Sequence, residues 1–245
     1  MAIMLRSGAV FLHIPKTGGS WVTQVLKDCG LLRFRFSHKH ADMRRVLDSP
    51  RLYRYQHWKR SARFGLSWHM PVADAFKFCF VRHPLDWYRS WWQYMSKHGW
   101  PVFSKKRLNG RRDWHPTAKL EDIQDVDFQR FMHKVVDCQP GFVSRMFDSF
   151  ATPEIHFVGR QERLVDDLIH VLRLLNERFD EDRIRSFPLV NVSRTKSAEV
   201  SWTEDLRRRA AHLEHKSMRR FGYSELSAEE VGPRHSPAPT RRVVV

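Results

Sequence analysis

Three short apolar runs, each followed at once by a helical pattern, constrain the fold of this chain more than any other feature. They span residues 9–14, 76–81 and 155–158, and the helical patterns after them span about residues 21–29, 84–97 and 164–175. Short apolar runs bounded by turn residues are typical of buried strands. Strand-then-helix units form parallel sheets whose faces are covered by helices. We therefore expect an α/β fold in which helices flank a central, mostly parallel sheet.

The rest of the chain fits a single domain. Residues 128–136 and 206–221 carry apolar side chains on one helical face, which favours packing against the core. Residues 31–69 are basic, aromatic and poorly periodic, and they predict no particular element. Three prolines stand among polar residues after position 226. We expect one domain over residues 1–226 and a disordered tail over 227–245.

The chain is strongly basic. Lys and Arg together number 43 against 27 Asp and Glu, giving a formal net charge of +16. Such a field attracts anions, among them nucleotides, sulfated glycans, nucleic acids and acidic membranes. The basic residues are spread along the chain instead of gathered in one block, so we expect no nucleic-acid partner.

The sequence also bears on the compartment. No run approaches the roughly 20 apolar residues that span a bilayer, and the first ten residues lack the apolar stretch of a signal peptide. Cys29, Cys79 and Cys138 are scattered without CxxC spacing, which favours buried thiols in a reducing compartment. We expect a cytoplasmic protein without a membrane span.

A glycine-rich turn joins the first apolar run to its helix. It reads Lys16-Thr17-Gly18-Gly19-Ser20. In such a turn the main-chain N–H groups at the start of a helix converge on one point, where the helix dipole favours a negative charge. Glycines allow close approach of a ligand, and the lysine adds a full charge. The turn predicts a phosphate site, with a plain surface turn as the alternative.

A second candidate site follows the next strand. Arg82 stands at the end of the run 76–81, and Ser90 lies about two turns into the following helix, which Pro84 can open. Open α/β sheets place their ligands at the ends of central strands. An arginine fork and a hydroxyl can hold a second phosphate there.

With both motifs in view, the sequence resembles the sulfotransferases that use 3′-phosphoadenosine-5′-phosphosulfate (PAPS), most closely their carbohydrate-type branch. The resemblance covers residues 9–223. It rests on His13-Ile14-Pro15-Lys16-Thr17-Gly18-Gly19-Ser20-Trp21, on Phe80-Val81-Arg82-His83-Pro84 with Ser90, on Val158-Gly159-Arg160-Gln161-Glu162 and on Asn191-Val192-Ser193. It implies a three-layer fold like that of P-loop NTPases. One departure is Trp87, where many relatives carry an arginine.

The resemblance also implies how PAPS is held. The 5′ end would contact Lys16, Thr17, Gly18, Gly19, Ser20 and Trp21, the 3′-phosphate Arg82 and Ser90, and the adenosine Asn191 and Ser193. It implies in-line sulfuryl transfer to a hydroxyl, in which Lys16 stabilises the leaving group. No metal is required, and no ligand cluster in the sequence demands one.

A base must take the proton of the acceptor hydroxyl, and histidine is the usual choice near neutral pH. Lys39-His40-Ala41 and Trp68-His69-Met70-Pro71 each resemble a histidine element of some relatives. His40 and His69 are therefore the candidate bases. The acceptor is open, and the basic surface suits an anionic glycan.

Three other interpretations are open on the sequence alone. A P-loop kinase would need the pattern GK[ST] after the glycines, and here the lysine precedes them. A basic binder of nucleic acid or glycan would show steeply salt-dependent binding. The third is a sulfotransferase that has lost catalysis, against which the intact Lys16 argues. The tryptophans near residues 87–100 favour core packing over a sugar-stacking platform.

Overall fold

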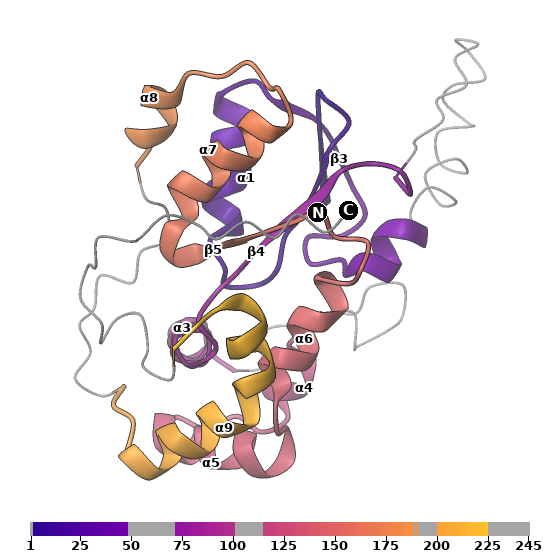
Figure 1. Ribbon diagram of the computed structural model, residues 1–245. Coiled ribbons are helices and arrows are strands. Elements are labelled where there is room, and N and C mark those ends of the chain that lie inside the picture. Colours follow the sequence, from indigo (N-terminus) through magenta and orange to yellow (C-terminus); the bar gives the residue numbers. More distant parts are fainter. Residues whose placement is uncertain (1, 49–71, 101–114, 189, 191–199, 225–245) are drawn as a thin grey trace.

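The computed structural model describes residues 2–48, 72–100, 115–188, 190 and 200–224. Within them, a five-stranded sheet lies between helices on both of its faces (Figure 1). The strands are β1 (Ala2–Leu5), β2 (Val10–Leu12), β3 (Leu32–Phe36), β4 (Lys77–Val81) and β5 (Phe157–Arg160). The helices are α1 (Gly19–Asp28), α3 (Pro84–His98), α4 (Ala118–Glu121), α5 (Phe128–Cys138), α6 (Phe142–Phe150), α7 (Leu164–Leu174), α8 (Glu181–Arg185) and α9 (Glu204–Phe221), with the 3-10 turn η1 (Gln161–Arg163).

The sheet is mixed, with strand order β3-β1-β2-β4-β5. The pairs β2–β4 and β4–β5 are parallel, whereas β1 runs antiparallel to both β2 and β3. The expectation of a mostly parallel sheet is therefore wrong for two of the four pairings. The cause is a tight hairpin, in which the Leu5 N–H donates to the Ala9 carbonyl (2.8 Å) and Gly8 adopts a φ of 90°. Parallel neighbours need a crossover of a dozen or more residues, which a hairpin cannot supply.

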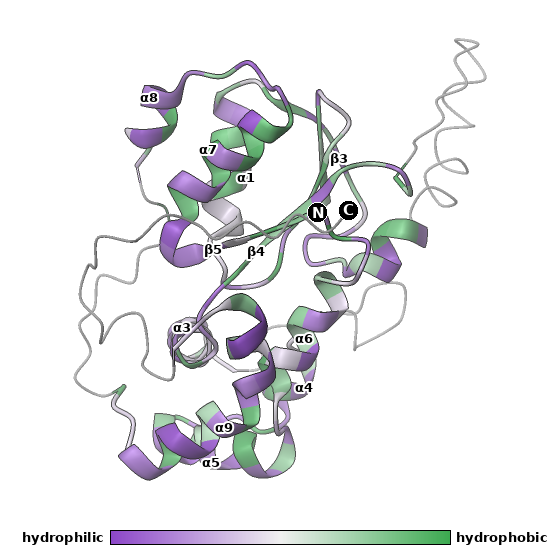
Figure 2. Ribbon diagram, viewed as in Figure 1, coloured by the Kyte–Doolittle hydropathy of each residue, from purple (hydrophilic) through white to green (hydrophobic). Residues whose placement is uncertain are grey.

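The three central strands, β1, β2 and β4, are buried on both faces. Along β2, Val10 and Leu12 join one hydrophobic cluster and Phe11 joins the other, as alternating side chains must. Helices α1 and α7 cover the face of Phe11, and α3, α5, α6 and α9 cover the opposite face. Figure 2 shows long hydrophobic stretches on α1 and α7, whereas α8 is mostly hydrophilic. The sequence expectation of helices on both faces is confirmed.

Element bounds differ modestly from those expected. The helices expected after the three strands, and those over residues 128–136 and 206–221, are present as α1, α3, α7, α5 and α9. The third strand begins two residues later than expected and includes Gly159. A Cβ at Gly159 would lie 2.5 Å from the Phe80 ring, so close packing of β5 on β4 explains this glycine. The expected tail over 227–245 lies outside the described residues.

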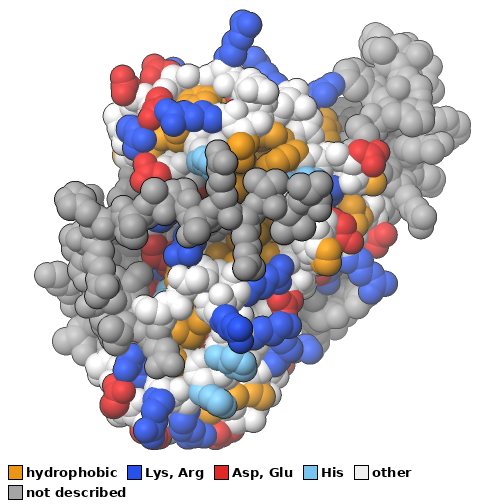
Figure 3. Space-filling view, in the orientation of Figure 1, with side chains coloured by type: hydrophobic (Ala, Val, Ile, Leu, Met, Phe, Trp, Pro, Cys, Tyr) orange, Lys and Arg blue, Asp and Glu red, His pale blue; other side chains and the backbone are white. Residues whose placement is uncertain are grey.

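Charge is distributed over the surface. On the face in Figure 3, Lys and Arg side chains stand over both halves of the protein with acidic side chains among them. Several are paired. For example, Asp148 accepts hydrogen bonds from Lys216 (2.6 Å) and Arg220 (2.8 Å). Among the described residues, no helix has the length and apolar character needed to cross a membrane.

Candidate active site

The lysine turn connects β2 to α1. Its backbone is bent back on itself, because Lys16 has a φ of 63° and Gly18, the N-cap of α1, has a φ of 80°. No side chain caps this helix, and Val22 N–H donates to the Gly18 carbonyl (3.2 Å). The N–H groups of Gly19, Ser20 and Trp21 therefore precede the first hydrogen bond of the helix. Free N–H groups at the start of a helix favour an anion, so this turn beside Lys16 is a candidate anion site.

Both glycines of this turn are required by packing. A Cβ at Gly18 would lie 2.5 Å from Cδ2 of Leu164, and a Cβ at Gly19 would lie 2.1 Å from Cδ2 of His13. A side chain at position 18 would have to displace the Leu164 side chain, and one at position 19 would have to displace the buried His13 ring. The two glycines therefore allow Leu164 and His13 to pack closely against the turn at the head of α1.

Three other predicted residues of the turn have different roles. The Thr17 hydroxyl is buried and donates to the Ile14 carbonyl (3.1 Å), which closes the turn. Ser20 is half-buried in the first turn of α1. The Trp21 ring is 2% exposed and meets Phe187 edge to face in the core. Only the main chain of Trp21 can therefore serve the site.

Arg82 and the lysine turn occur at the same edge of the sheet. Arg82 directly follows β4, which is parallel to β2 and hydrogen-bonded to it. Burial, together with the neighbouring positive charges of Arg82 and Lys39, lowers the pKa of Lys16 to about 8. Lys16 also lies over the ring of Tyr94 on α3, 4.5 Å from its centroid. The structure thus brings the two predicted anion-binding segments together.

The start of α3 is fastened by residues to which the sequence assigned no role. Glu162 accepts hydrogen bonds from the His83 main-chain N–H (2.8 Å) and from the Tyr223 hydroxyl (3.0 Å). His83 in turn accepts from Leu85 N–H through Nδ1 (3.3 Å) and donates from Nε2 to the Ser224 carbonyl (3.0 Å). We call Glu162, His83 and Tyr223 the glutamate clasp. His83 and Glu162 both stand in segments that carry the family resemblance, but the sequence does not indicate that they contact each other.

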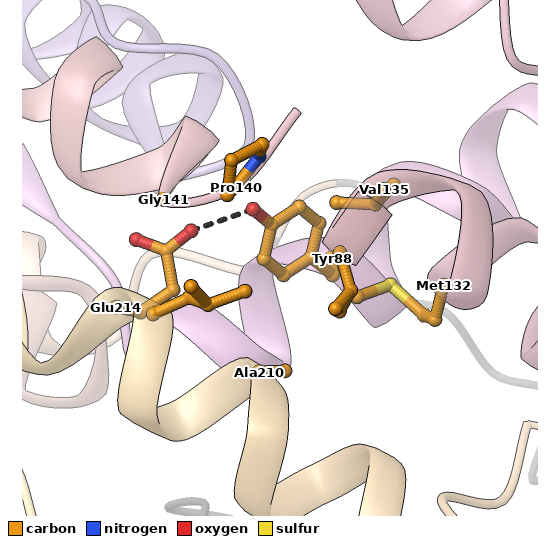
Figure 4. Close-up of a pocket in the computed structure, with 9 residues that line it drawn as sticks. Tyr88, Met132, Val135, Pro140, Gly141, Ala210 and Glu214 are labelled. Atoms are coloured by element: carbon orange, nitrogen blue, oxygen red, sulfur yellow. Dashed lines mark hydrogen bonds between the residues drawn. The ribbon is translucent and has the colours of Figure 1, made fainter. Parts of the chain in front are cut away.

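Helix α3 also carries the aromatic cluster. Trp87, Trp91 and Trp92 are buried, which confirms core packing as their role. Next to them, the Tyr88 hydroxyl donates to Glu214 of α9 (2.6 Å), beside a small cavity that Figure 4 shows between α3, α5 and α9. Ser90, the other predicted ligand of this segment, is half-buried.

Glu214 is a buried carboxylate with a structural function. It accepts hydrogen bonds from the main-chain N–H groups of Val143 (3.0 Å) and Ser144 (2.7 Å) at the start of α6, and from the Ser144 hydroxyl (2.6 Å). Carboxylates are stabilised at helix N-termini, where the N–H groups lack partners within the helix. Glu214 therefore joins α3, α6 and α9, and it belongs to the core and not to the site.

Of the two candidate bases, the structure describes His40. Its ring contacts His13 (centroids 4.7 Å) and His115 (4.8 Å), and burial together with these neighbours lowers its pKa well below the usual value. His40 Nδ1 lies 3.0 Å from the His13 carbonyl oxygen, which can only accept, so Nδ1 carries the proton. The neutral ring then has its lone pair on Nε2.

Three predicted site residues, His69, Asn191 and Ser193, lie outside the described residues. In the part of the chain that the structure describes, no group of three His, Cys, Asp or Glu side chains is arranged to hold a metal ion. The rings of His13 and His115 both contact the ring of His40, so these three histidines form a packed cluster.

Comparison with known proteins identifies the family of this chain. No curated protein and no solved structure matches the chain. The family model described as Sulfotransferase family matches residues 3–224, which include the lysine turn, Arg82, Ser90 and the glutamate clasp. This match spans most of the 245 residues. The chain belongs to the sulfotransferase family.

Proposed function

We propose that this protein transfers the sulfuryl group of PAPS to a hydroxyl, and that the acceptor is a carbohydrate. The observation that carries the proposal is the proximity of the lysine turn and Arg82 at one edge of the sheet, which is reflected in the lowered pKa of Lys16. Two anion-binding segments so arranged suit a nucleotide with phosphates at both its 5′ and 3′ ends. ATP has no 3′-phosphate for the second segment to bind.

The residues present fit such a cofactor. The main-chain N–H groups at the head of α1 have no side-chain cap, and a Cβ at Gly18 or Gly19 would clash with its neighbours. Lys16 and Arg82 supply positive charge. When bound, PAPS would supply the sulfuryl group. Gly18, Gly19 and Ser20 would hold its 5′-phosphate, with Thr17 and Trp21 contributing main-chain N–H groups, and Asn191 and Ser193 would contact the adenosine.

Lys16 is the residue suited to stabilise the charge that develops on the leaving phosphate. A pKa of about 8 leaves roughly nine-tenths of the side chains protonated at neutral pH. A bound polyanion would favour the charged form further. A preorganised charge of this kind in a partly desolvated turn is a common source of transition-state stabilisation.

Arg82 and Ser90 would contact the 3′-phosphate. Arg82 offers a forked cation at the strand end, and Ser90 a hydroxyl on the helix that starts beside it. The glutamate clasp holds this helix start through the main chain of His83. Arg82 should thereby discriminate PAPS from nucleotides that lack a 3′-phosphate.

His40 is the better supported base. Its Nδ1–H is engaged by the His13 carbonyl, which leaves Nε2 to accept the proton of the acceptor hydroxyl. His13 packs against Gly19, and the His40 ring contacts the His13 ring. One side chain therefore separates His40 from the lysine turn. His69 stays the second candidate.

Calorimetric titration with 3′,5′-adenosine bisphosphate and with ATP, both without magnesium, tests the cofactor. We expect the bisphosphate to bind and ATP to bind far more weakly. Arg82→Ala should abolish this preference, whereas Arg208→Ala, at an exposed arginine on α9, should retain it with the same loss of charge. Equal affinity for the two nucleotides in the wild type would refute the proposal.

Transfer of label from a labelled donor to carbohydrate acceptors tests the chemistry. Lys16→Ala should abolish transfer while leaving the fold intact. His40→Asn should reduce turnover more than His133→Asn, at an exposed histidine on α5 that serves as the control. A larger loss in His69→Asn than in His40→Asn would reassign the base.

A further inference from the structure

Trp87 connects the two anion-binding segments through one hydrogen bond. Its indole Nε1–H donates to the Pro15 carbonyl oxygen at 2.8 Å, and its side chain is fully buried. Pro15 immediately precedes Lys16, while Trp87 lies in the first turns of α3. The bond therefore runs from the helix that follows Arg82 to the turn that holds the lysine.

This bond bears directly on the conformation of Lys16. The Pro15 carbonyl belongs to the peptide group that joins Pro15 to Lys16, so holding that oxygen fixes the plane of the peptide. The orientation of this plane sets φ of Lys16, which is 63°. A left-handed φ is unfavourable for a residue with a Cβ, and it persists only where the surroundings hold it. The Trp87 indole is one of the groups that hold it.

The same helix positions the second segment. Arg82 and the N-cap His83 precede α3, and Ser90 lies within it. A shift of α3 relative to the lysine turn would change the separation of the two anion-binding segments. The Trp87–Pro15 bond resists such a shift, because it is short and shielded from water.

We infer that Trp87 is a positioning residue, which sets the distance between the lysine turn and the Arg82–Ser90 segment so that one doubly phosphorylated nucleotide can contact both. The inference rests on the proposed function. It predicts that loss of the indole N–H weakens ligands that contact both segments and spares ligands that contact one.

Trp91 provides a matched control. It lies one turn further along α3, its ring stacks on that of Trp87 at 6.2 Å, and it is equally buried. Its Nε1 has no hydrogen-bond partner among the described residues. Trp87→Phe and Trp91→Phe thus make the same change in the same cluster, and only the first removes a hydrogen bond.

The experiment is calorimetric titration of the wild type and both variants with 3′,5′-adenosine bisphosphate, 5′-AMP and 3′-AMP. We expect Trp87→Phe to bind the bisphosphate about fivefold to tenfold more weakly, as the loss of one buried hydrogen bond implies. Either monophosphate should change less than about twofold, and Trp91→Phe should retain all three affinities. A role in stability alone would not produce this selectivity.

A second substitution removes the same N–H group with a smaller change of side-chain shape, so it tests the inference even if Trp87→Phe does not fold. Incorporation of benzothienylalanine at position 87 replaces the N–H by sulfur at nearly constant shape, with the same substitution at 91 as control. Unchanged bisphosphate affinity at position 87, an equal loss for the monophosphates, or an equal loss in the control would overturn the inference. Failure of the wild type to bind the bisphosphate would instead overturn the proposed function, and the inference with it.

Discussion

The pKa of Lys16 leads to a specific prediction about binding. In the free protein this pKa is about 8, because the side chain is partly desolvated and stands near Arg82 and Lys39. A polyanionic nucleotide in the lysine turn would reverse the sign of the local charge and raise this pKa. A group whose pKa rises on binding contributes its full effect below the free pKa and loses it as the pH rises above that value.

The magnitude follows from the free pKa. If the bound lysine stays protonated, the apparent dissociation constant rises as the protonated fraction of the free protein falls. The affinity for 3′,5′-adenosine bisphosphate should then fall about tenfold between pH 7 and pH 9. At pH 8, binding should take up about half a proton per site.

Calorimetry in two buffers of different ionisation enthalpy measures both quantities. Lys16→Arg is the control, because arginine stays charged over this range and should abolish the pH dependence. An affinity of the wild type that is flat from pH 7 to pH 9 would refute the reasoning. So would an equal decline in Lys16→Arg, since another group would then be responsible.

Three further substitutions test other parts of the structure. Gly19→Ala places a Cβ on the His13 ring and should lower stability by about 1–3 kcal/mol and weaken bisphosphate binding; wild-type values in urea unfolding and calorimetry would contradict the packing argument. Glu214→Ala leaves several buried donors without an acceptor and should lower the free energy of unfolding by about 2–4 kcal/mol, with a loss below about 1 kcal/mol counting against it. Tyr223→Phe removes the hydroxyl that donates to Glu162 and should weaken the bisphosphate more than 5′-AMP in the same titration; an equal effect on both would show that the clasp does not serve the 3′ side.

The parallel strands at the centre of the fold, and the helices that follow them, could be predicted from the sequence. The runs 76–81 and 155–158 lie near the observed β4 and β5, and the helices after them begin where Pro84 and Leu164 stand. Elements with a clear apolar pattern and a residue that favours a helix start are the easiest to predict from sequence. The lysine turn could also be predicted, because two glycines between a strand and a helix indicate that another group approaches the main chain closely there.

The antiparallel edge was missed although its signals were present. Ser7 and Gly8 mark the hairpin between β1 and β2, and Leu5 and Ala9 close it. In β3, residues 32–36 alternate apolar and basic side chains, a period of two that the surrounding aromatic residues obscured. β3 lies at the edge of the sheet, and it carries little apolar signal because its two arginines face solvent.

The glutamate clasp, the capping by Glu214 and the Trp87–Pro15 bond were beyond sequence reasoning for another reason. Each joins positions more than 60 residues apart. Local patterns report neighbours along the chain, whereas these pairs depend on how helices pack in three dimensions. Trp87 could be assigned to the core, but the acceptor of its N–H could not be foreseen.

The glutamate clasp also has a consequence for how the protein is made. Tyr223 stands near the end of the matched domain, and its partner Glu162 secures the helix that follows Arg82. Almost the whole domain must therefore be synthesised before the glutamate clasp can form completely. Contacts between such distant positions form late, because long loops must close first. A nascent chain truncated before Tyr223 should thus form its lysine turn while Glu162 lacks the hydrogen bond from the Tyr223 hydroxyl.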